Sequence, residues 1–149
     1  MADLVGFVAS ITGIVAFAVS VANTLDNLIT DIQEAPSSLS TLRIQVKAFS
    51  DASANVARAL KASGAAPSTV NTYSAQLWDA MRGGDVILKQ LHNEMAEIRS
   101  SKPLRQPDGK IREMTLRERV MFKWNEPQIK KWTDALDTHC SVFLLLLYR

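Results

Sequence analysis

The stretch that decides the fold is LVGFVASITGIVAFAVSVANTL, residues 4–25, which carries no charged side chain, and no Lys or Arg precedes Arg43. A helix over this stretch is about 33 Å long, close to the thickness of a bilayer core. Five polar side chains dilute it: Ser10, Thr12, Ser20, Asn23 and Thr24. The stretch therefore fits two structures, the central helix of a soluble bundle and a membrane-spanning helix.

The stretch has two different faces when it is placed on a helix. Small residues recur at spacings of three and four along one face, namely Gly6, Ala9, Gly13, Ala16, Ser20 and Asn23. Bulkier residues gather on roughly the opposite face, namely Leu4, Val8, Ile11, Val15, Val21, Leu25 and Leu28. A small-residue face lets another backbone approach closely. We expect this face to seat a neighbouring helix of a soluble bundle at rest, with membrane association as a second state.

The composition indicates one soluble domain in a reducing compartment. The chain has 149 residues, 47% hydrophobic and 21% charged, which is ordinary for a globular protein. Its formal net charge of +2 is too small to indicate a nucleic-acid partner. The single cysteine, Cys140, excludes an internal disulfide, and no basic segment precedes the apolar run as a secretory signal requires. A cytoplasmic protein is expected.

Helical periodicity dominates the rest of the chain. The expected helices are about 3–33 with a break near Asn23–Thr24, a second from Ser37 or Ser38, a third from Ser68, a short one at 116–123 and a last from 125–127. The second helix shows an apolar seam of Leu39, Leu42, Val46, Phe49, Ser53, Val56 and Leu60. The last helix shows a similar apolar seam, which consists of Ile129, Trp132, Leu136, Cys140, Phe143 and Leu147. The pattern predicts an all-α antiparallel bundle of four long helices plus a short helix.

Two features interrupt this pattern. Gly83–Gly84 lies in the middle of the third helix, where it predicts a kink or a close helix crossing. Residues 100–114 carry two prolines, a glycine and several charges, and predict a long exposed loop.

The run Leu144–Leu147 is apolar on all sides, from which we expect a domain excised from a longer chain.

The sequence predicts no enzyme, no cofactor and no metal site. Its two histidines, His92 and His139, lie far apart, and the adjacent His139 and Cys140 point about 100° apart on a helix. No phosphate-binding glycine loop is present. Trp78, Trp124 and Trp132 fit a membrane interface or a bundle core. For Trp124 and Trp132 we expect the core, because both lie near the apolar seam.

Positive charge is concentrated between residues 102 and 131. Nine basic residues face four acidic ones there, the basic ones being Lys102, Arg105, Lys110, Arg112, Arg117, Arg119, Lys123, Lys130 and Lys131. Such a stretch can contact anionic lipid, nucleic acid or an acidic partner. It is also what a solvated surface looks like, which is the expectation for most of it. The weak net charge argues against nucleic acid.

Three stretches together resemble one family. They are MADLVGFVASITGIVAFAVSVANTL at the start, DIQEAPSSLSTLRIQVKAF after it and FKWNEPQIKKWTDALDTHCSVFLLLL at the end. The chain resembles the HeLo-like N-terminal domain of fungal STAND (NLR-like) proteins. The resemblance implies a helical bundle that executes regulated cell death, moving from the cytoplasm to the plasma membrane on activation. It implies self-association into a homo-oligomer and insertion of the N-terminal helix into the membrane.

The resemblance also nominates residues. By position, the element that inserts and oligomerises comprises Leu4, Gly6, Phe7, Ala9, Ile11, Gly13, Ile14, Ala16, Phe17 and Ser20. The charge of the basic residues of 102–131, and not the resemblance, makes them the candidate contacts to anionic membrane lipids. The alternative hypothesis is a soluble module that binds itself, or another helical signalling domain as an adaptor, without entering the membrane.

Overall fold

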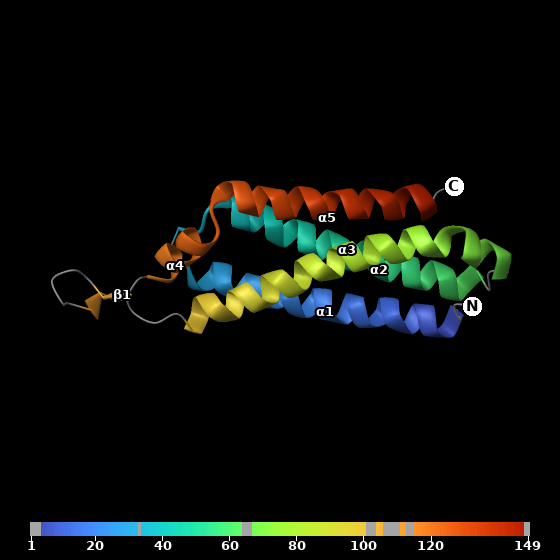
Figure 1. The fold of residues 1–149 in the computed structure, drawn as a ribbon, viewed down its shortest axis with the longest axis horizontal. Helices are drawn as coiled ribbons and strands as arrows, with labels where there is room; N and C mark the ends of the chain where they lie inside the picture. Colours follow the sequence, from blue (N-terminus) through green and yellow to red (C-terminus); the bar gives the residue numbers. More distant parts are fainter. Residues whose placement is uncertain are drawn as a thin grey trace.

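The computed structural model describes residues 4–32, 34–63, 67–100, 104–105, 111–112 and 115–147. Within them it is an all-α bundle of four long helices and one short helix, as predicted (Figure 1). The helices are α1 (Leu4–Asp31), α2 (Ser37–Ser63), α3 (Pro67–Ser100), α4 (Leu116–Lys123) and α5 (Glu126–Leu147). Two short strands, β1 (Leu104–Arg105) and β2 (Ile111–Arg112), pair antiparallel between α3 and α4.

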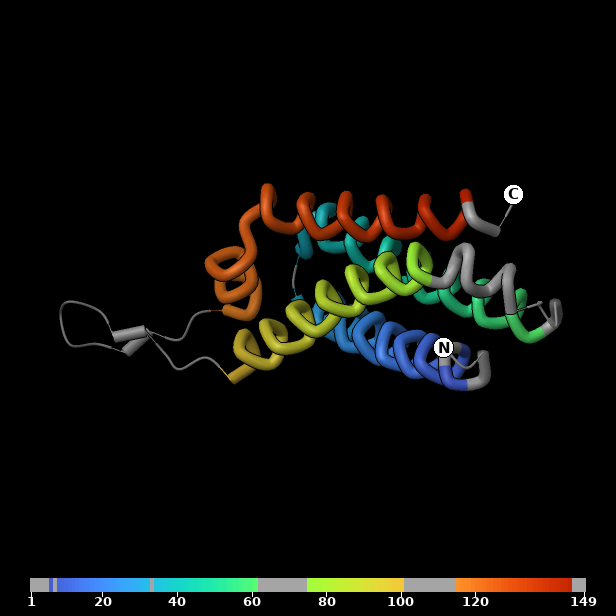
Figure 2. The backbone as a smooth tube through the Cα atoms, turned by 45° about the vertical axis from the view of Figure 1, so that its right-hand side comes forward, coloured from blue at the N-terminus to red at the C-terminus, as the bar shows by residue number. Residues whose placement is uncertain are grey.

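Consecutive long helices run in opposite directions, but they are not all neighbours. α1 packs against α2 and α3, and α5 packs against the same two helices from the other side. α2 and α3 therefore lie diagonally opposite, and the parallel helices α2 and α5 become neighbours (Figures 1 and 2). α1 begins and α5 ends at one end of the bundle, whereas the strands and α4 lie at the other.

Local sequence signals explain the starts of α2, α4 and α5. The Thr115 hydroxyl accepts a hydrogen bond from the Glu118 amide at 3.1 Å and caps α4. The Asn125 side chain accepts from the Gln128 amide at 2.9 Å, which supports the predicted start of α5. α2 begins at Ser37, directly after Pro36. One turn carries strain that the sequence did not reveal, because Glu34 between α1 and α2 adopts φ 58°, a region that favours glycine.

The predicted break in the first helix is wrong, since α1 continues through Asn23 and Thr24. The Thr24 hydroxyl donates to the Ser20 carbonyl at 2.9 Å, so it does not compete for the helix backbone. The flanking side chains of Ala22 and Leu25 are buried. Packing of these side chains outweighs the weak helix propensity of the Asn–Thr pair.

The core is built from the predicted seams. In α2 every seam residue from Leu39 to Val56 is buried, and Leu60 is half-buried. In α5 the same holds from Ile129 to Phe143. Trp124 and Trp132 are buried edge to face, with ring centroids 5.2 Å apart, and Trp78 is half-buried against the core. The expectation that Trp124 and Trp132 belong to the core is confirmed.

The glycine pair in α3 marks a close helix crossing, one of the two predicted outcomes. A Cβ at Gly84 would overlap the buried ring of Phe49 from α2. A Cβ at Gly83 would overlap the imidazole of His139 from α5. A side chain of the neighbouring α5 and one of the diagonally opposite α2 therefore use the space that the missing side chains leave on α3.

The expectation of a continuous loop over residues 100–114 is corrected by β1 and β2. Leu104 is paired with Arg112, and Arg105 with Ile111. Strands of two residues are too short to produce a period-two pattern, so they could not be predicted from the sequence. The remaining residues of this segment lie outside the described part of the chain.

Candidate functional site

The inward side of α1 is the bulky face. Its buried residues follow spacings of three and four along the whole helix, namely Val8, Ile11, Ile14, Ala18, Val21, Ala22, Leu25 and Leu28. Ile32, just beyond the helix, is buried as well. From Ile11 onward, these residues join one core with residues of α2, α3 and α5. This face needs no membrane to explain it, because a bundle buries the same apolar seam.

The small-residue face of α1 points to solvent, which corrects the expectation that it seats a neighbouring helix of the bundle. Its members are all exposed: Gly6, Ala9, Gly13, Ala16, Ser20 and Asn23. At Gly13 an added Cβ would meet nothing within 4 Å. We call these six residues the outer face of α1. Bulky side chains gain more from burial than alanine or glycine, so they take the inward side.

The structure therefore divides the residues nominated for insertion and self-association. Gly6, Ala9, Gly13, Ala16 and Ser20 are exposed together on the outer face. Ile11 and Ile14 belong to the core. Phe17 is half-buried at the α1–α3 seam, where its ring meets the edge of His92 at a centroid distance of 5.6 Å. The side chains of Leu4 and Phe7 lie outside the described part of the chain.

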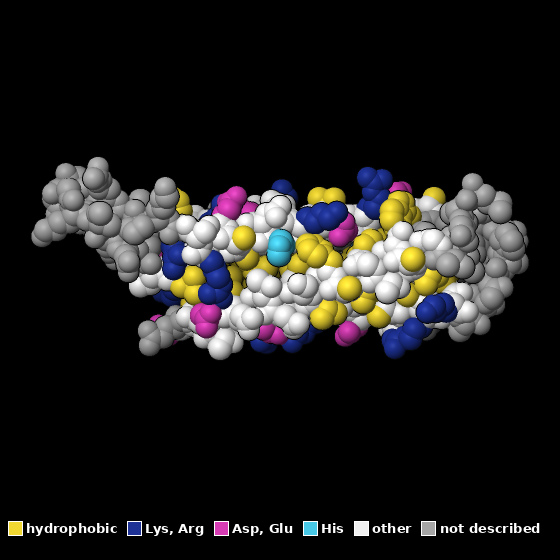
Figure 3. All heavy atoms as spheres, turned by 90° about the horizontal axis from the view of Figure 1, so that it is seen from below, with side chains coloured by type: hydrophobic (Ala, Val, Ile, Leu, Met, Phe, Trp, Pro, Cys, Tyr) yellow, Lys and Arg dark blue, Asp and Glu magenta, His cyan; other side chains and the backbone are white. Residues whose placement is uncertain are grey.

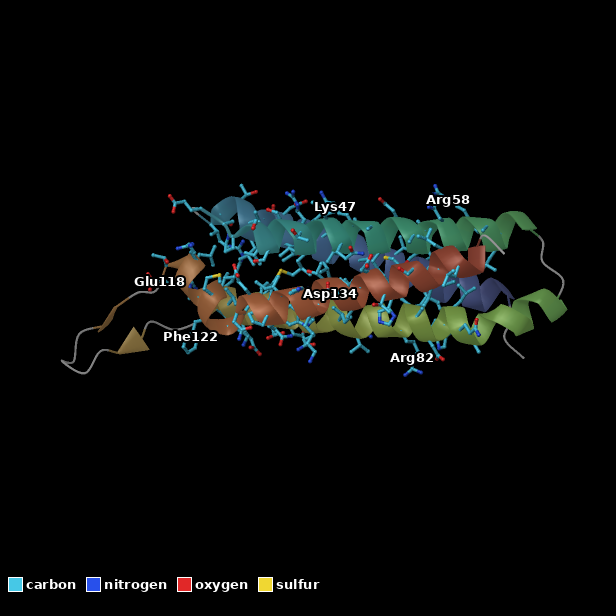
Figure 4. The ribbon with its side chains drawn as sticks, turned by 90° about the horizontal axis from the view of Figure 1, so that it is seen from above. Lys47, Arg58, Arg82, Glu118, Phe122 and Asp134 are labelled. Carbon is cyan, nitrogen blue, oxygen red and sulfur yellow. The ribbon has the colours of Figure 1, made fainter. Side chains whose placement is uncertain are left out.

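The outer side of α1 differs in charge from the other long helices. Every exposed α1 residue from Gly6 to Asn23 is uncharged. In Figure 3, which looks at the molecule from below, white and yellow atoms predominate across the middle of the face, together with a histidine and a neighbouring basic and acidic side chain. By contrast, Lys47 and Arg58 project outward from α2, and Arg82 from α3 (Figure 4). By length and composition, α1 is apolar enough to cross a membrane over Val8–Asp31.

Hydroxyl groups in α1 donate within the helix. Ser10 donates to the Gly6 carbonyl at 3.0 Å and Thr12 to the Val8 carbonyl at 2.9 Å. Similar bonds occur in α5, at Thr133 and Thr138, so they are not peculiar to α1. Their consequence is specific to an apolar setting, however, since a hydroxyl that donates to its own helix leaves no unsatisfied donor when water is removed.

The only charged residues of α1 are Asp26 and Asp31, near its C-terminal end. Asp26 contacts two bases of α2, Arg43 and Lys47, each at 3.2 Å. Asp31 contacts Arg99 of α3 at 2.9 Å. α1 is thus joined to both neighbouring helices by ion pairs at one end, and by apolar packing along the rest of its length.

Some residues of the basic stretch form contacts within the bundle, whereas others are exposed to solvent. Arg119 donates to the carbonyl oxygens of Ile98 and Arg99, at 2.9 and 3.3 Å, and so satisfies the C-terminal end of α3. Lys123 pairs with Glu97, and this hydrogen bond raises the pKa of Lys123. Both side chains therefore connect α4 to α3.

The remaining members of the basic stretch fall into two groups. Arg117, Lys130 and Lys131 are exposed and form no ion pair with the residues that the structure describes. Arg105 and Arg112 belong to β1 and β2, with side chains outside the described part, and Lys102 and Lys110 lie outside it altogether. α4 lies at the far end of the bundle from the start of α1 (Figure 2). Its Arg117 therefore lies at the opposite end from the start of the apolar helix.

Three shallow grooves accompany α5. One, of about 680 Å³, lies between α2 and α5 and includes Cys140, whose thiol has a pKa raised by burial to about 11. Another, of about 520 Å³, lies between α3 and α5 beside His139. The third, of about 570 Å³, lies between the N-terminal turns of α2 and α5. Among the described residues, no group of three or more His, Cys, Asp or Glu side chains is placed to hold a metal ion.

Sequence reasoning missed the residues that tie the elements together. The roles of Asp26 and Arg119 depend on partners 17 to 21 residues away, and no periodic pattern marks them. Comparison of the chain with family models, curated proteins and solved structures gives no match.

Proposed function

We propose that this protein is a membrane-acting effector domain of the HeLo-like type, at the front of a fungal NLR-like protein. In the resting state α1 completes a cytoplasmic bundle. On oligomerisation α1 leaves the bundle and enters the plasma membrane, which executes regulated cell death. The observation that carries the proposal is the uncharged outer face of α1, because a soluble bundle explains the inner face of this helix but not the outer one.

The energetic argument compares the two environments of α1. In water, an exposed helix face normally carries charged side chains, as α2 and α3 do here. In a bilayer, each charge near the middle of a helix costs about 2.5–3.5 kcal/mol on the insertion scale. α1 has none between Gly6 and Leu25. Its small outer residues also permit close approach of another α1, which supports self-association in the membrane.

The test places charge on the outer face without disturbing the core. Ala9→Glu with Ala16→Glu adds two carboxylates to α1, at two exposed positions. Ala48→Glu with Ala59→Glu adds two to exposed positions of α2 and serves as the matched control. We expect the α1 variant to lose dye leakage from vesicles with anionic lipid by about 100-fold or more, and the control to leak like the original.

The outcome separates the two hypotheses. Equal leakage from both variants, or no leakage from folded original protein even when it is fused to an oligomeric coiled coil, contradicts the membrane proposal. The adaptor alternative then takes its place, because an exposed face of small residues also suits close contact with a helix of a protein partner.

A further inference from the structure

The ion pairs of α1 share an arrangement that packing alone does not require. Both charged residues of α1, Asp26 and Asp31, are paired across a helix boundary, one to α2 and the other to α3. The C-terminal end of α1 is therefore joined by ion pairs to α2 on one side and to α3 on the other. The rest of the helix, Leu4–Leu25, carries no such attachment, because it contains no charge.

These pairs are accessible and individually weak. The side chains of Arg43, Lys47 and Arg99 are 34%, 52% and 41% exposed. Accessible pairs of this kind change an equilibrium by about two- to fivefold each. They do not hold the bundle together, but they bias the choice between packed and released α1. A bias of this size is easily reversed by another ligand of the same bases.

The chemistry of the bases identifies that ligand. Arginine and lysine bind phosphate groups as readily as carboxylates, and the guanidinium fork binds them with two parallel hydrogen bonds. A bilayer surface of anionic lipid offers such groups at high density, and it also repels the two aspartates. Headgroup phosphates therefore compete with the two aspartates for the same basic side chains. Each headgroup that binds favours loss of an aspartate pair, and each lost pair frees a base for a headgroup.

We propose that Asp26 and Asp31 latch α1 to α2 and α3, and that anionic lipid headgroups open the latch by binding Arg43, Lys47 and Arg99. The inference rests on the proposed membrane function and adds a trigger to it. The bases then have two states: at rest they neutralise the aspartates, and at the membrane they bind headgroup phosphates while α1 is released.

The test breaks the same ion pairs from opposite sides. Asp26→Asn frees the bases of α2, whereas Arg43→Gln with Lys47→Gln removes them. Asp85→Asn is the control, because it breaks a 2.9 Å pair with Lys89 inside α3 that does not involve α1. Amide hydrogen exchange of α1 is measured in solution, with vesicles of phosphatidylcholine alone or with phosphatidylserine, and with inorganic phosphate. Dye leakage is recorded in parallel.

In solution, we expect both latch variants to speed exchange in α1 by about two- to fivefold and the control to leave it unchanged. With phosphatidylserine vesicles, exchange in α1 of the original protein and of Asp26→Asn rises further, but Arg43→Gln with Lys47→Gln responds less. Identical behaviour of the two latch variants on these vesicles overturns the proposal, since a purely structural pair does not depend on which partner is removed.

Two further results would also overturn it. The first is the absence of a vesicle effect on α1 of the original protein, and the second is equal opening by inorganic phosphate, which would make the bilayer irrelevant. Exchange and leakage keep the two proposals apart. If α1 opens on phosphatidylserine vesicles as described but no dye escapes, the latch stands and permeabilisation is wrong.

Discussion

α1 and α2 are neighbours of nearly equal length, 28 and 27 residues, and they bury their inner sides in the same way. Each places a seam of apolar residues in one shared core. Their outer sides have little in common. α2 exposes charged residues such as Lys47 and Arg58, whereas the outer face of α1 exposes only small uncharged ones. Folding constrains the inner sides, so the difference between the outer sides is where function is to be sought.

The largest effect expected from this comparison is on the inner sides. Leu25→Ala in α1 and Leu42→Ala in α2 each remove a fully buried side chain, and each should lower the free energy of unfolding by about 2–5 kcal/mol. Ser20→Ala, on the outer face of α1, should change it by less than about 0.5 kcal/mol. Chemical denaturation followed by circular dichroism measures all three. If Leu25→Ala proved as mild as Ser20→Ala, α1 would not be packed at rest.

Two glycines extend the comparison, because one faces the core and the other faces solvent. Gly84→Ala should destabilise the fold by about 1–3 kcal/mol, since the new methyl group overlaps the buried ring of Phe49. Gly13→Ala should stabilise it by about 0.5–1 kcal/mol, because the site is open and alanine favours the helix. Midpoints of chemical denaturation show whether each variant is less or more stable than the original protein. A loss of stability in Gly13→Ala would mean that the outer face already has a partner in solution.

These residues also show how far the sequence could predict the structure. Apolar periodicity identified the seam of α2, and the segment 125–127 placed the start of α5, because both signals are local and depend on few neighbours. Periodicity also separated the two faces of α1. It did not say which face would turn inward, and the expectation that the small face seats a neighbouring helix was wrong. The larger gain from burying bulky side chains decides that choice, and the prediction had instead followed the close helix approach that small residues permit.

The basic stretch shows the same limit. Arg117 and Arg119 stand two positions apart on one short helix, and nothing in the sequence distinguishes them as lipid contacts. The structure separates them. Arg119 donates hydrogen bonds to the C-terminal carbonyl groups of α3, whereas Arg117 is exposed to solvent. The latch bases, Arg43, Lys47 and Arg99, were not nominated from the sequence, since they lie outside the conspicuous cluster.

This pair of arginines gives the next prediction. Arg119→Ala should lower the free energy of unfolding by about 1–2 kcal/mol, because it leaves the Ile98 and Arg99 carbonyl groups without their donor. Arg117→Ala should leave stability within about 0.5 kcal/mol and, under the membrane proposal, weaken sedimentation with anionic vesicles. Equal stability of the two variants would contradict the structural role of Arg119. Equal vesicle binding by Arg117→Ala and the original would remove Arg117 from the lipid contact.

The smallest effect concerns the two histidines, of which His139 faces a neighbouring helix and His92 lies exposed on α3. Partial burial between α3 and α5 lowers the pKa of His139 below its ordinary value. The unfolded chain therefore binds a proton at higher pH than the folded protein, so stability is full above about pH 6.5 and falls as the pH drops through that value toward the folded pKa.

Denaturation curves between about pH 7.5 and 5.5 measure this slope. His139→Gln should reduce it, whereas His92→Gln should leave the contribution of His139 in place. An unchanged slope in His139→Gln would assign the acid sensitivity to other groups. Protonation of His139 weakens the α3–α5 contact and not the contacts of α1, whereas His92 contacts the ring of Phe17 in α1. In the His92→Gln variant, acid should therefore loosen the bundle without favouring release of α1. Faster exchange confined to α1 of that variant at low pH would contradict this separation.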